Sequence, residues 1–268
     1  MITKILKLLK FLPYYLEVFA KKLGGRGIMS PNNNGEFKFL EEIVKSSESN
    51  EVCFFDGGAN YGDHSMKFLS LCKLYKKQPI LYSIEPFPKT FQKLTDRIPV
   101  TNGEVLNISL GNEKKKVKFY FNEEEPGSNS NIPHYYLNKF TEVEQDTIDN
   151  IIEKKNIKKI NFLKLDIEGF EWQCLQGTKE ALKSNMIDYI QLEYNGTWVD
   201  GGGSIKKIFD LCKLNTYSLF IITKNHLLSI PSYHMVLDDF YYSNLLMIKK
   251  IKDKLLPVKR KAIPFLSN

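Results

Sequence analysis

Short apolar runs alternate with amphipathic stretches along most of the chain. The runs have the length of buried strands, and we predict strands over residues 52–55, 80–84, 104–108, 160–165, 186–192, 217–223 and 241–248. Between them, apolar residues recur at helical spacing, which predicts helices over residues 36–44, 63–75, 147–155 and 204–214 and another that ends near residue 97. Strands that alternate with helices build α/β folds, so we expect one seven-stranded, mostly parallel sheet with helices on both faces.

Two further short strands, over residues 117–121 and 141–144, flank a polar loop. This loop, residues 122–133, holds Ser128, Asn129, Ser130 and Asn131. Loops of this length inside a compact domain are commonly functional, so we expect a lid or a loop that binds the substrate. Asp146 precedes the helix over residues 147–155 and is predicted to cap it.

The length of the chain fits one large core. With 268 residues, of which 43 % are hydrophobic, one α/β core can be buried, whereas two complete domains would be crowded. We predict a basic amphipathic helix and linker over residues 1–35, a single α/β domain over residues 36–250, and a basic tail over residues 251–268. The four cysteines, which lie in apolar runs without paired spacing, indicate reduced core thiols of a cytosolic protein: Cys53, Cys72, Cys174 and Cys212.

The positive charge is concentrated at the two ends of the chain. Residues 1–26 carry a charge of +5 and residues 249–261 carry +6, so a total of +7 leaves −4 for the rest. The high isoelectric point therefore says little about the centre of the chain, where the candidate chemistry lies.

The first segment places Ile5, Leu8, Leu9 and Leu12 on one helical face and lysines on the other. No uncharged run approaches the roughly 18 residues that a spanning helix needs, and a signal-peptide cleavage site is missing. Two alternatives stay open. The segment packs on the domain, or it lies in a membrane interface together with the basic tail. We therefore expect a cytoplasmic protein, with peripheral membrane contact as an option.

A glycine turn follows the first predicted strand. Asp56 opens the sequence D-G-G-A-N-Y-G, which includes Gly58, Asn60 and Gly62, and a helix comes next. Strand, glycine turn and helix allow backbone to approach a nucleotide-like ligand, although a glycine turn alone is weak evidence. Glu85 ends the second strand, where a carboxylate can accept hydrogen bonds from both ribose hydroxyls.

The spacing between the glycine turn and Glu85 is shared by proteins that bind nicotinamide cofactors and by proteins that bind S-adenosylmethionine. The sequence of the turn distinguishes between these two classes. It lacks the G-x-G-x-x-G pattern that binds a pyrophosphate, and the acidic residue that opens it favours a cationic ligand group. S-adenosylmethionine has a sulfonium and no phosphate, which makes it the expected cofactor. Asn107 and Ser109, at the end of the third strand, complete the cofactor contacts that we expect.

The stretch over residues 160–177 contains the densest candidate chemistry. An apolar strand ends at Asp166, and Glu168 and Glu171 follow before a predicted helix. Ligands of α/β sheets bind at the carboxyl ends of the strands, so Asp166 and Glu193, at the end of the fifth strand, are expected to face one pocket. They could activate a hydroxyl or hold a divalent ion such as Mg²⁺ or Mn²⁺. Alternatively, Glu168 and Glu171 only complement the helix dipole, and Glu193 only caps its strand in water.

Four side chains are candidates for the catalytic base or for contact with the acceptor. Asp166 is the first candidate for the catalytic base, and His64 and His134 are weaker ones, since lone histidines are usually structural. Trp198 could stack on a sugar face, although a core or surface tryptophan is equally consistent with the sequence.

The order of these motifs resembles the FkbM-type S-adenosylmethionine-dependent methyltransferases from about residue 50 to 195. The motifs are DGGANYG, IEPFP, LNISLGN, VEQDTIDNII, LKLDIEGFEWQCLQG and IQLE. The fifth is similar to the family signature K-x-D-x-E-G-x-E, followed by a leucine and a glycine, with every acidic position filled. Gly57 departs from the bulkier apolar residue usual in the family and loosens the turn.

This resemblance implies a Rossmann-like class I methyltransferase fold and methylation of a hydroxyl on a sugar, a glycan or another small-molecule scaffold. It implies cofactor contacts from Asp56, Gly58, Asn60, Gly62 and Glu85. We expect the acceptor to be a sugar or glycan, free or carried on a lipid. The oligomeric state is not indicated.

Two rival functions come from other classes. A nucleic-acid methyltransferase would explain the high isoelectric point, but the chain has no Asn-Pro-Pro-Tyr-like element and no Pro-Cys nucleophile, so we expect no nucleic-acid partner. A non-catalytic membrane-associated module would explain the basic ends, yet it would not need all three acidic residues of the signature.

Overall fold

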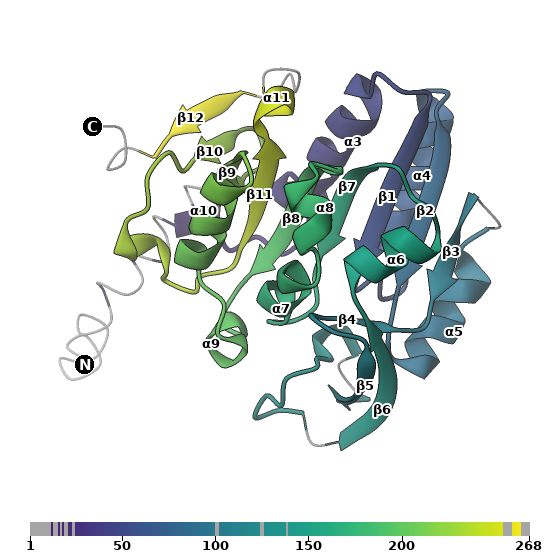
Figure 1. Cartoon of the computed structure of the whole chain (residues 1–268). Coiled ribbons are helices and arrows are strands. Elements are labelled where there is room, and N and C mark those ends of the chain that lie inside the picture. The colour runs from purple at the N-terminus through teal and green to yellow at the C-terminus, as the bar shows by residue number, and fades with distance from the viewer. Residues whose placement is uncertain are drawn as a thin grey trace, which may run out of the picture.

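A computed structural model describes residues 25–99, 102–123, 126–137, 139–253 and 259–263, together with residues 12, 16, 18, 21 and 22. Its main feature is a nine-stranded sheet in the order β12-β10-β9-β11-β8-β7-β1-β2-β3 (Figure 1). The strands are β1 (Glu51–Gly57), β2 (Gln78–Ile84), β3 (Asn102–Leu106), β7 (Ile160–Leu165), β8 (Ile187–Tyr194), β9 (Tyr217–Ile222), β10 (Leu227–Ser229), β11 (Ser243–Lys249) and β12 (Arg260–Ala262).

The seven predicted strands of the main sheet are all present, and β10 and β12 extend one edge. Strands β3, β2, β1, β7 and β8 run parallel, whereas β11 is antiparallel to both β8 and β9. From β1 the chain builds outwards through β2 and β3, and it later returns to the other side of β1 with β7. This reversal puts a topological switch point between β1 and β7, where sheets of this kind bind ligands.

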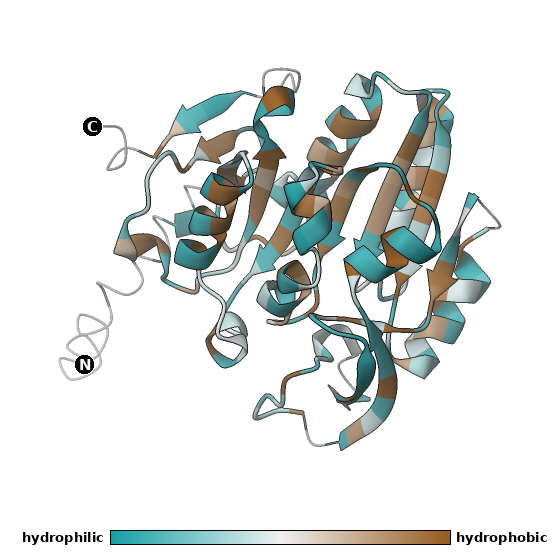
Figure 2. Ribbon diagram, in the orientation of Figure 1, coloured by the Kyte–Doolittle hydropathy of each residue, from teal (hydrophilic) through white to brown (hydrophobic). Residues whose placement is uncertain are grey.

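Helices cover both faces of the sheet. The helices are α2 (Pro31–Asn34), α3 (Glu36–Ser46), α4 (Asp63–Leu74), α5 (Pro88–Arg97), α6 (Ile148–Lys154), α7 (Glu171–Gln176), α8 (Lys179–Lys183), α9 (Trp198–Gly201), α10 (Ile205–Leu214) and α11 (Lys250–Asp253). The turns Pro126–Ser128 and Met235–Leu237 are 3₁₀-helical. Figure 2 shows the apolar residues on the strands and on the sides of the helices that face them.

Two apolar layers form because strand side chains alternate between the faces of the sheet. On one face, Phe54 and Phe162 pack with Phe68 of α4 and the apolar side of α3. On the other, Leu163 and Ile190 pack with the apolar sides of α6, α8 and α10. The central strands are therefore mostly apolar, as the sequence predicts, and several of the candidate site residues follow at their carboxyl ends.

A second, three-stranded sheet lies below the carboxyl ends of the main strands (Figure 1). It consists of β4 (Ser109–Leu110), β5 (Lys115–Phe121) and β6 (Lys139–Asp146), in the order β4-β6-β5. The predicted strands over residues 117–121 and 141–144 belong to it. The third main strand ends at Leu106, earlier than expected, because the chain turns there and Ser109 pairs with β6.

The predicted cap of α6 is wrong by one residue. The side chain of Thr147 accepts the hydrogen bond from the amide of Asn150, so Thr147 is the N-cap. Asp146 ends β6 instead, and its Oδ1 accepts from the amide of Thr147 and the side chain of Asn150.

Described residues from both ends of the chain pack on the main sheet. The guanidinium of Arg26 donates to both carboxylate oxygens of Asp239, at 2.8 and 2.7 Å. Gly27 donates its amide hydrogen to the carbonyl of Tyr242, and β12 pairs with β10. The division into residues 1–35, 36–250 and 251–268 stays a prediction, and most of the predicted N-terminal helix lies outside the described residues.

Two further expectations concern the whole chain. All four cysteines are buried and unpaired, as predicted. Among the described residues, we find no helix with the length and apolar character required to cross a bilayer.

Candidate active site

The carboxyl ends of β1, β2 and β7 surround a pocket of about 560 Å³, and the second sheet closes it from below. Its lining combines glycine, amide and carboxyl groups with an apolar floor: Gly58, Asn60, Ile84, Glu85, Pro86, Ile108, Ser109, Leu110, Phe119, Gly127, Asn129, Asn131, Asp166, Ile167 and Glu168. Five of the predicted site residues therefore line one pocket, namely Gly58, Asn60, Glu85, Ser109 and Asp166.

The glycine turn after β1 allows two strand ends to approach closely. Gly58 has a φ of +73°, and a Cβ there would lie 1.8 Å from the carbonyl oxygen of Asp166. The amide of Asn60 donates to Glu85 Oε2, and the amide of Phe87 donates to Glu85 Oε1. Burial raises the pKa of Glu85 to about 7, against the effect of these two hydrogen bonds.

The other predicted cofactor residues lie around this pocket without lining it. Asp56 is buried beneath the turn, where its Oδ2 accepts a 2.6 Å hydrogen bond from Ser65. Gly62 is the N-cap of α4, on the far side of the turn. Asn107 donates to the carbonyls of Glu85 and Pro86, which fixes the Glu85 turn. Their roles in cofactor binding stay predictions.

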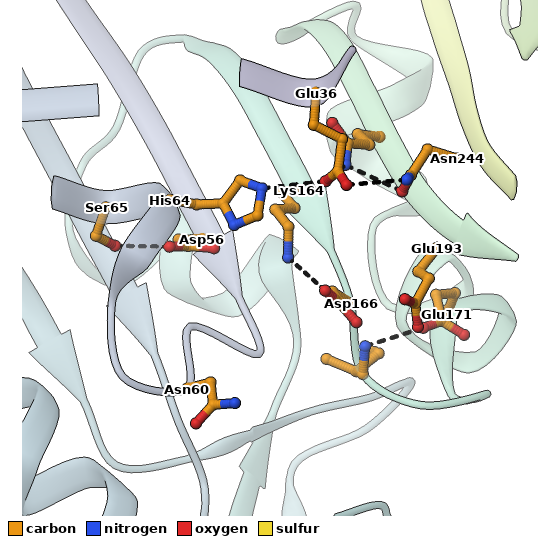
Figure 3. Close-up of polar contacts among 12 residues, drawn as sticks. Glu36, Asp56, Asn60, His64, Ser65, Lys164, Asp166, Glu171, Glu193 and Asn244 are labelled. Carbon is orange, nitrogen blue, oxygen red and sulfur yellow. Dashed lines mark hydrogen bonds and ion pairs between the residues drawn. The ribbon is translucent and has the colours of Figure 1, made fainter. Parts of the chain in front are cut away.

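An ion pair between a buried lysine and a partly exposed aspartate lies next to the pocket. Lys164, on β7, has a side chain that is only 2 % exposed, and its Nζ lies 2.8 Å from Asp166 Oδ2 (Figure 3). Burial alone would lower the pKa of Lys164, but the charges of Asp166, Asp56 and Glu36 outweigh it and raise the pKa. Burial alone would raise the pKa of Asp166, but Lys164 outweighs it and lowers the pKa, so Asp166 is held ionised.

Three carboxyl groups gather at the ends of β7 and β8. One oxygen of each of Asp166, Glu168 and Glu193 lies within 4.8 Å of the others. Burial and the charge of Asp166 raise the pKa of Glu168 to about 8 and that of Glu193 well above its usual value. Glu193, next to Asp166, therefore favours its protonated form, while Asp166 favours its ionised form.

The backbone that places Glu168 is strained and requires glycine next to it. Glu168 has a φ of +52°, and Gly169 follows at +93°. A Cβ at Gly169 would lie 2.5 Å from the carbonyl oxygen of Thr197. Ser130 and His134 donate to the Glu168 carbonyl, which holds this turn against the loop that the sequence singled out. Strain of this kind is typical of functional sites.

Glu171 has a structural position behind the cluster. It is fully buried, its Oε1 accepts from the amide of Ile167, and its Oε2 has no partner among the described residues. Burial raises its pKa to about 8. Glu171 lies in the first turn of α7, as expected for a carboxylate that complements the helix dipole. The sequence did not indicate that this carboxyl group is buried.

Stability should therefore fall as the pH rises from about 5 to 8. Over this range folded Glu171 keeps its proton while the unfolded chain has lost it, so the folded state binds more protons and loses stability with rising pH. In Glu171→Gln, the decrease in the free energy of unfolding over this pH range should be smaller by on the order of 3 kcal/mol. Urea unfolding at pH 5.5 and 8 measures it, with the exposed Glu153→Gln as control. Equal pH dependence in the two variants would contradict the assignment.

An open groove of about 1340 Å³ adjoins the pocket on the side of β8. It is lined by Met29, Ser128, His134, Tyr135, Tyr136, Glu168, Glu193, Asn195, Gly196, Thr197, Asp200 and Tyr242. Glu168 belongs to both linings, so the pocket and the groove meet at its carboxyl group.

The two histidines have different positions. His64 lies 3.0 Å from Glu36 Oε2, on the far side of Lys164 from Asp166, and lines neither the pocket nor the groove (Figure 3). His134 lines the groove, but one ring nitrogen faces Asp200 at 2.8 Å and the other faces the Glu168 carbonyl at 3.2 Å. Both nitrogens of His134 are thus engaged, and the ring is suited to holding Glu168 in place.

Trp198 does not stack on a ligand. Its side chain is 1 % exposed, and its indole donates to the Glu193 carbonyl at 2.7 Å. It therefore supports the end of β8 from within, and the sugar-stacking alternative is wrong.

Sequence reasoning missed several residues of the site. Lys164 was visible as a charged residue within an apolar strand, which is costly unless it is paired. Phe119 comes from β5, and Met29 and Tyr242 come from segments at opposite ends of the chain. No local pattern marks these three, because only the tertiary fold brings them to the site.

The sheet order with antiparallel β11 between β8 and β9, and a glycine turn and acidic residue at the ends of β1 and β2, define a class I S-adenosylmethionine-dependent methyltransferase. A sequence model of the methyltransferase FkbM domain matches residues 56–219, more than half of the chain. The chain belongs to the FkbM methyltransferase family.

Individual proteins resemble the chain more distantly. The hexuronic acid methyltransferase AglP of Haloferax volcanii is 25 % identical over 182 residues, which cover 68 % of this chain and 71 % of AglP. A methyltransferase FkbM from Methylobacillus flagellatus KT is 17 % identical with a TM-score of 0.47, over 75 % of this chain and 44 % of that one. An S-adenosylmethionine-dependent methyltransferase from Agrobacterium tumefaciens is 6 % identical with a TM-score of 0.45, over 84 % of this chain and 64 % of that one.

The pocket suits the cofactor of this family. Three buried polar atoms on its lining have no partner among the described residues: Asn60 Oδ1, Asn129 Nδ2 and Asn131 Nδ2. Buried polar groups are normally hydrogen-bonded, so these atoms indicate a polar ligand. The Glu85 carboxyl can accept further hydrogen bonds from vicinal hydroxyls, and Ile108 and Phe119 provide apolar surface for a purine base.

Gly58→Ala should weaken cofactor binding strongly. The new Cβ would meet the Asp166 carbonyl at 1.8 Å, so the turn or the end of β7 has to move. We expect affinity for S-adenosylhomocysteine to fall at least about 100-fold by calorimetry, equivalent to about 3 kcal/mol. The matched control is Gly196→Ala, because a Cβ at Gly196 meets no atom within 4 Å. Equal affinity in both variants would contradict the assignment of this turn.

Proposed function

We propose that the protein transfers the methyl group of S-adenosylmethionine to a hydroxyl of a sugar, a glycan or a similar small scaffold. The observation that carries this proposal is that Glu168 lines both the cofactor pocket and the groove. A hydroxyl in the groove can thus approach the cofactor at a wall of carboxyl groups. AglP, a relative named for methylation of a hexuronic acid, supports a sugar acceptor.

The residues of the chain would bind and orient the acceptor and would take the proton of its hydroxyl. When bound, S-adenosylmethionine supplies a methyl group that its sulfonium already activates. The protein then has to align the acceptor oxygen and remove its proton, and alignment alone can supply several kcal/mol. Asp166, ionised beside Lys164, is the proposed base, and the raised pKa of neighbouring Glu193 favours the protonated form of that carboxyl.

A divalent cation is a second proposed use of the same carboxyl groups. Asp166, Glu168 and Glu193 offer oxygen ligands within 4.8 Å of one another, which is the ligand type that Mg²⁺ and Mn²⁺ prefer. A cation there would favour the ionised forms of Glu168 and Glu193 and would lower the pKa of a bound hydroxyl. This use competes with the base mechanism for the same oxygens.

A panel of sugar acceptors with a labelled methyl donor tests the function. Label should pass to a hydroxyl of at least one sugar, in an ether that survives mild alkali, whereas a methyl ester is hydrolysed. Parallel reactions with a chelator, and with Mg²⁺ or Mn²⁺ added back, separate the two mechanisms. Transfer to a nucleic acid only, or cofactor binding without transfer to any acceptor, would contradict the proposal.

We also propose that the enzyme works in the cytoplasm, with peripheral contact to a membrane through its basic ends when its acceptor is carried on a lipid. Residues 249–261 carry a charge of +6, which supports attraction to anionic lipids. Salt-sensitive binding to anionic vesicles, lost on deletion of residues 1–23, tests this contact. Binding that survives the deletion would contradict a role for the N-terminal segment.

A further inference from the structure

The groove beside the cofactor pocket is lined by carboxyl groups, and His134 is the one basic side chain among its described lining residues. Glu168, Glu193 and Asp200 line it, and none of its described lining residues is a lysine or an arginine. The basic ring there, His134, already faces Asp200 at 2.8 Å. An acidic group that entered the groove would meet no lysine or arginine among the described lining residues.

Two basic side chains of the described residues, Lys164 and Arg26, pair with carboxylates. Lys164 is buried and pairs with Asp166, and the guanidinium of Arg26 holds both oxygens of Asp239. Neither Lys164 nor Arg26 lines the groove. A carboxylate loses hydration when it is bound in a cleft, and without a cation or several donors that loss is not recovered.

The remaining surface of the groove is aromatic and apolar. Tyr135 is fully exposed, Tyr136 stacks on His134, and Met29 is 74 % exposed. Tyr242 completes this part of the lining. Exposed tyrosine and methionine side chains suit the C–H face of a sugar ring and its uncharged substituents, while the side-chain oxygens of the groove accept hydrogen bonds from hydroxyls.

We infer that the groove selects a neutral sugar as the methyl acceptor and rejects a hexuronic acid. This inference rests on the proposed function and narrows its substrate class. It separates this chain from AglP, whose name specifies a hexuronic acid. The basis is the lining of the groove: an uncharged ring can use both the aromatic wall and the acceptor oxygens, whereas a uronate brings its negative charge next to the Asp200 carboxylate and meets no lysine or arginine among the described lining residues.

The test uses matched pairs of p-nitrophenyl glycosides that differ only in a CH₂OH or a carboxylate at C6, in the gluco, galacto and manno series. Methyl transfer is measured with labelled S-adenosylmethionine, and binding is measured by saturation-transfer NMR on the full chain loaded with S-adenosylhomocysteine. We expect kcat/KM for the preferred neutral glycoside to exceed that of its uronide at least 100-fold, with binding in the same order.

A charge substitution in the groove gives a second readout. Asp200→Lys places a cation on the lining and should raise the binding and methylation of the uronide at least tenfold. The control is Asp210→Lys, which makes the same charge change at an exposed position on α10, outside the groove. Its uronide binding should match the native chain.

The outcomes separate the inference from the proposed function. A uronide that is bound and methylated as well as its neutral partner overturns the neutral-sugar inference and leaves sugar methylation intact. Cofactor binding without binding or methylation of any glycoside overturns both. A preference for the neutral glycoside that Asp200→Lys does not reduce also overturns the inference, because the charge at the groove would then not decide the substrate.

Discussion

Asp166→Asn is expected to lower kcat by about a thousandfold, because a positioned general base contributes about 10²- to 10⁴-fold to such reactions. The amide cannot take the hydroxyl proton, and Lys164 loses its closest negative partner. Binding of S-adenosylhomocysteine should stay within about threefold of the native value, since the Gly58 and Glu85 contacts are unchanged. Single-turnover rates with a saturating neutral acceptor measure the effect.

The matched control for this variant is Asp210→Asn, which removes an exposed carboxylate far from the pocket. It should keep native turnover. If Asp166→Asn also kept native turnover while the cofactor bound normally, Asp166 would not be the base, and Glu168→Gln would be the next variant to compare.

Lys164→Met is expected to lower the free energy of unfolding by about 3 kcal/mol, the lower end of the cost of removing one partner of a buried ion pair, because Asp166 is partly exposed. The Lys164 charge favours the ionised forms of Asp166, Asp56 and Glu36, and all three would lose a cation. The pKa of Asp166 should then rise, so the plateau of the pH–rate profile should begin at a higher pH. Urea unfolding and a pH–rate profile test the two effects separately.

Lys158→Met is the control, because Lys158 is exposed and its side chain contacts Asn156 instead of the site. It should change stability by less than about 0.5 kcal/mol. A Lys164→Met chain as stable as this control, with an unchanged pH profile, would contradict the role given to the ion pair.

Hydrophobic patterning predicted the main sheet because each of its central strands is buried on both faces. The runs over residues 160–165 and 186–192 are mostly apolar, because strands buried on both faces favour apolar side chains. Their polar residues are Asn161, Lys164, Asp188 and Gln191. The short strands β4, β10 and β12 escaped prediction, since two or three residues give no period.

The candidate site was predictable where function depends on the end of a strand. Gly58, Glu85 and Asp166 each follow or close an apolar run, and the topology of parallel strands brings such ends together. The acceptor side was less predictable, because Met29 and Tyr242 reach the groove only through contacts between distant parts of the chain. His64 was a plausible catalytic residue from its type and its position near the glycine turn. In the structure its ring contacts Glu36 and does not line the pocket.

The most direct test of the central claim is a crystal structure of the protein with S-adenosylhomocysteine. We predict that the nucleoside occupies the pocket between Gly58 and Phe119, that the ribose hydroxyls reach Glu85, and that the sulfur faces Glu168, where the groove begins. A nucleoside bound at another surface, or in the pocket with its sulfur turned away from the carboxyl cluster, would contradict the account.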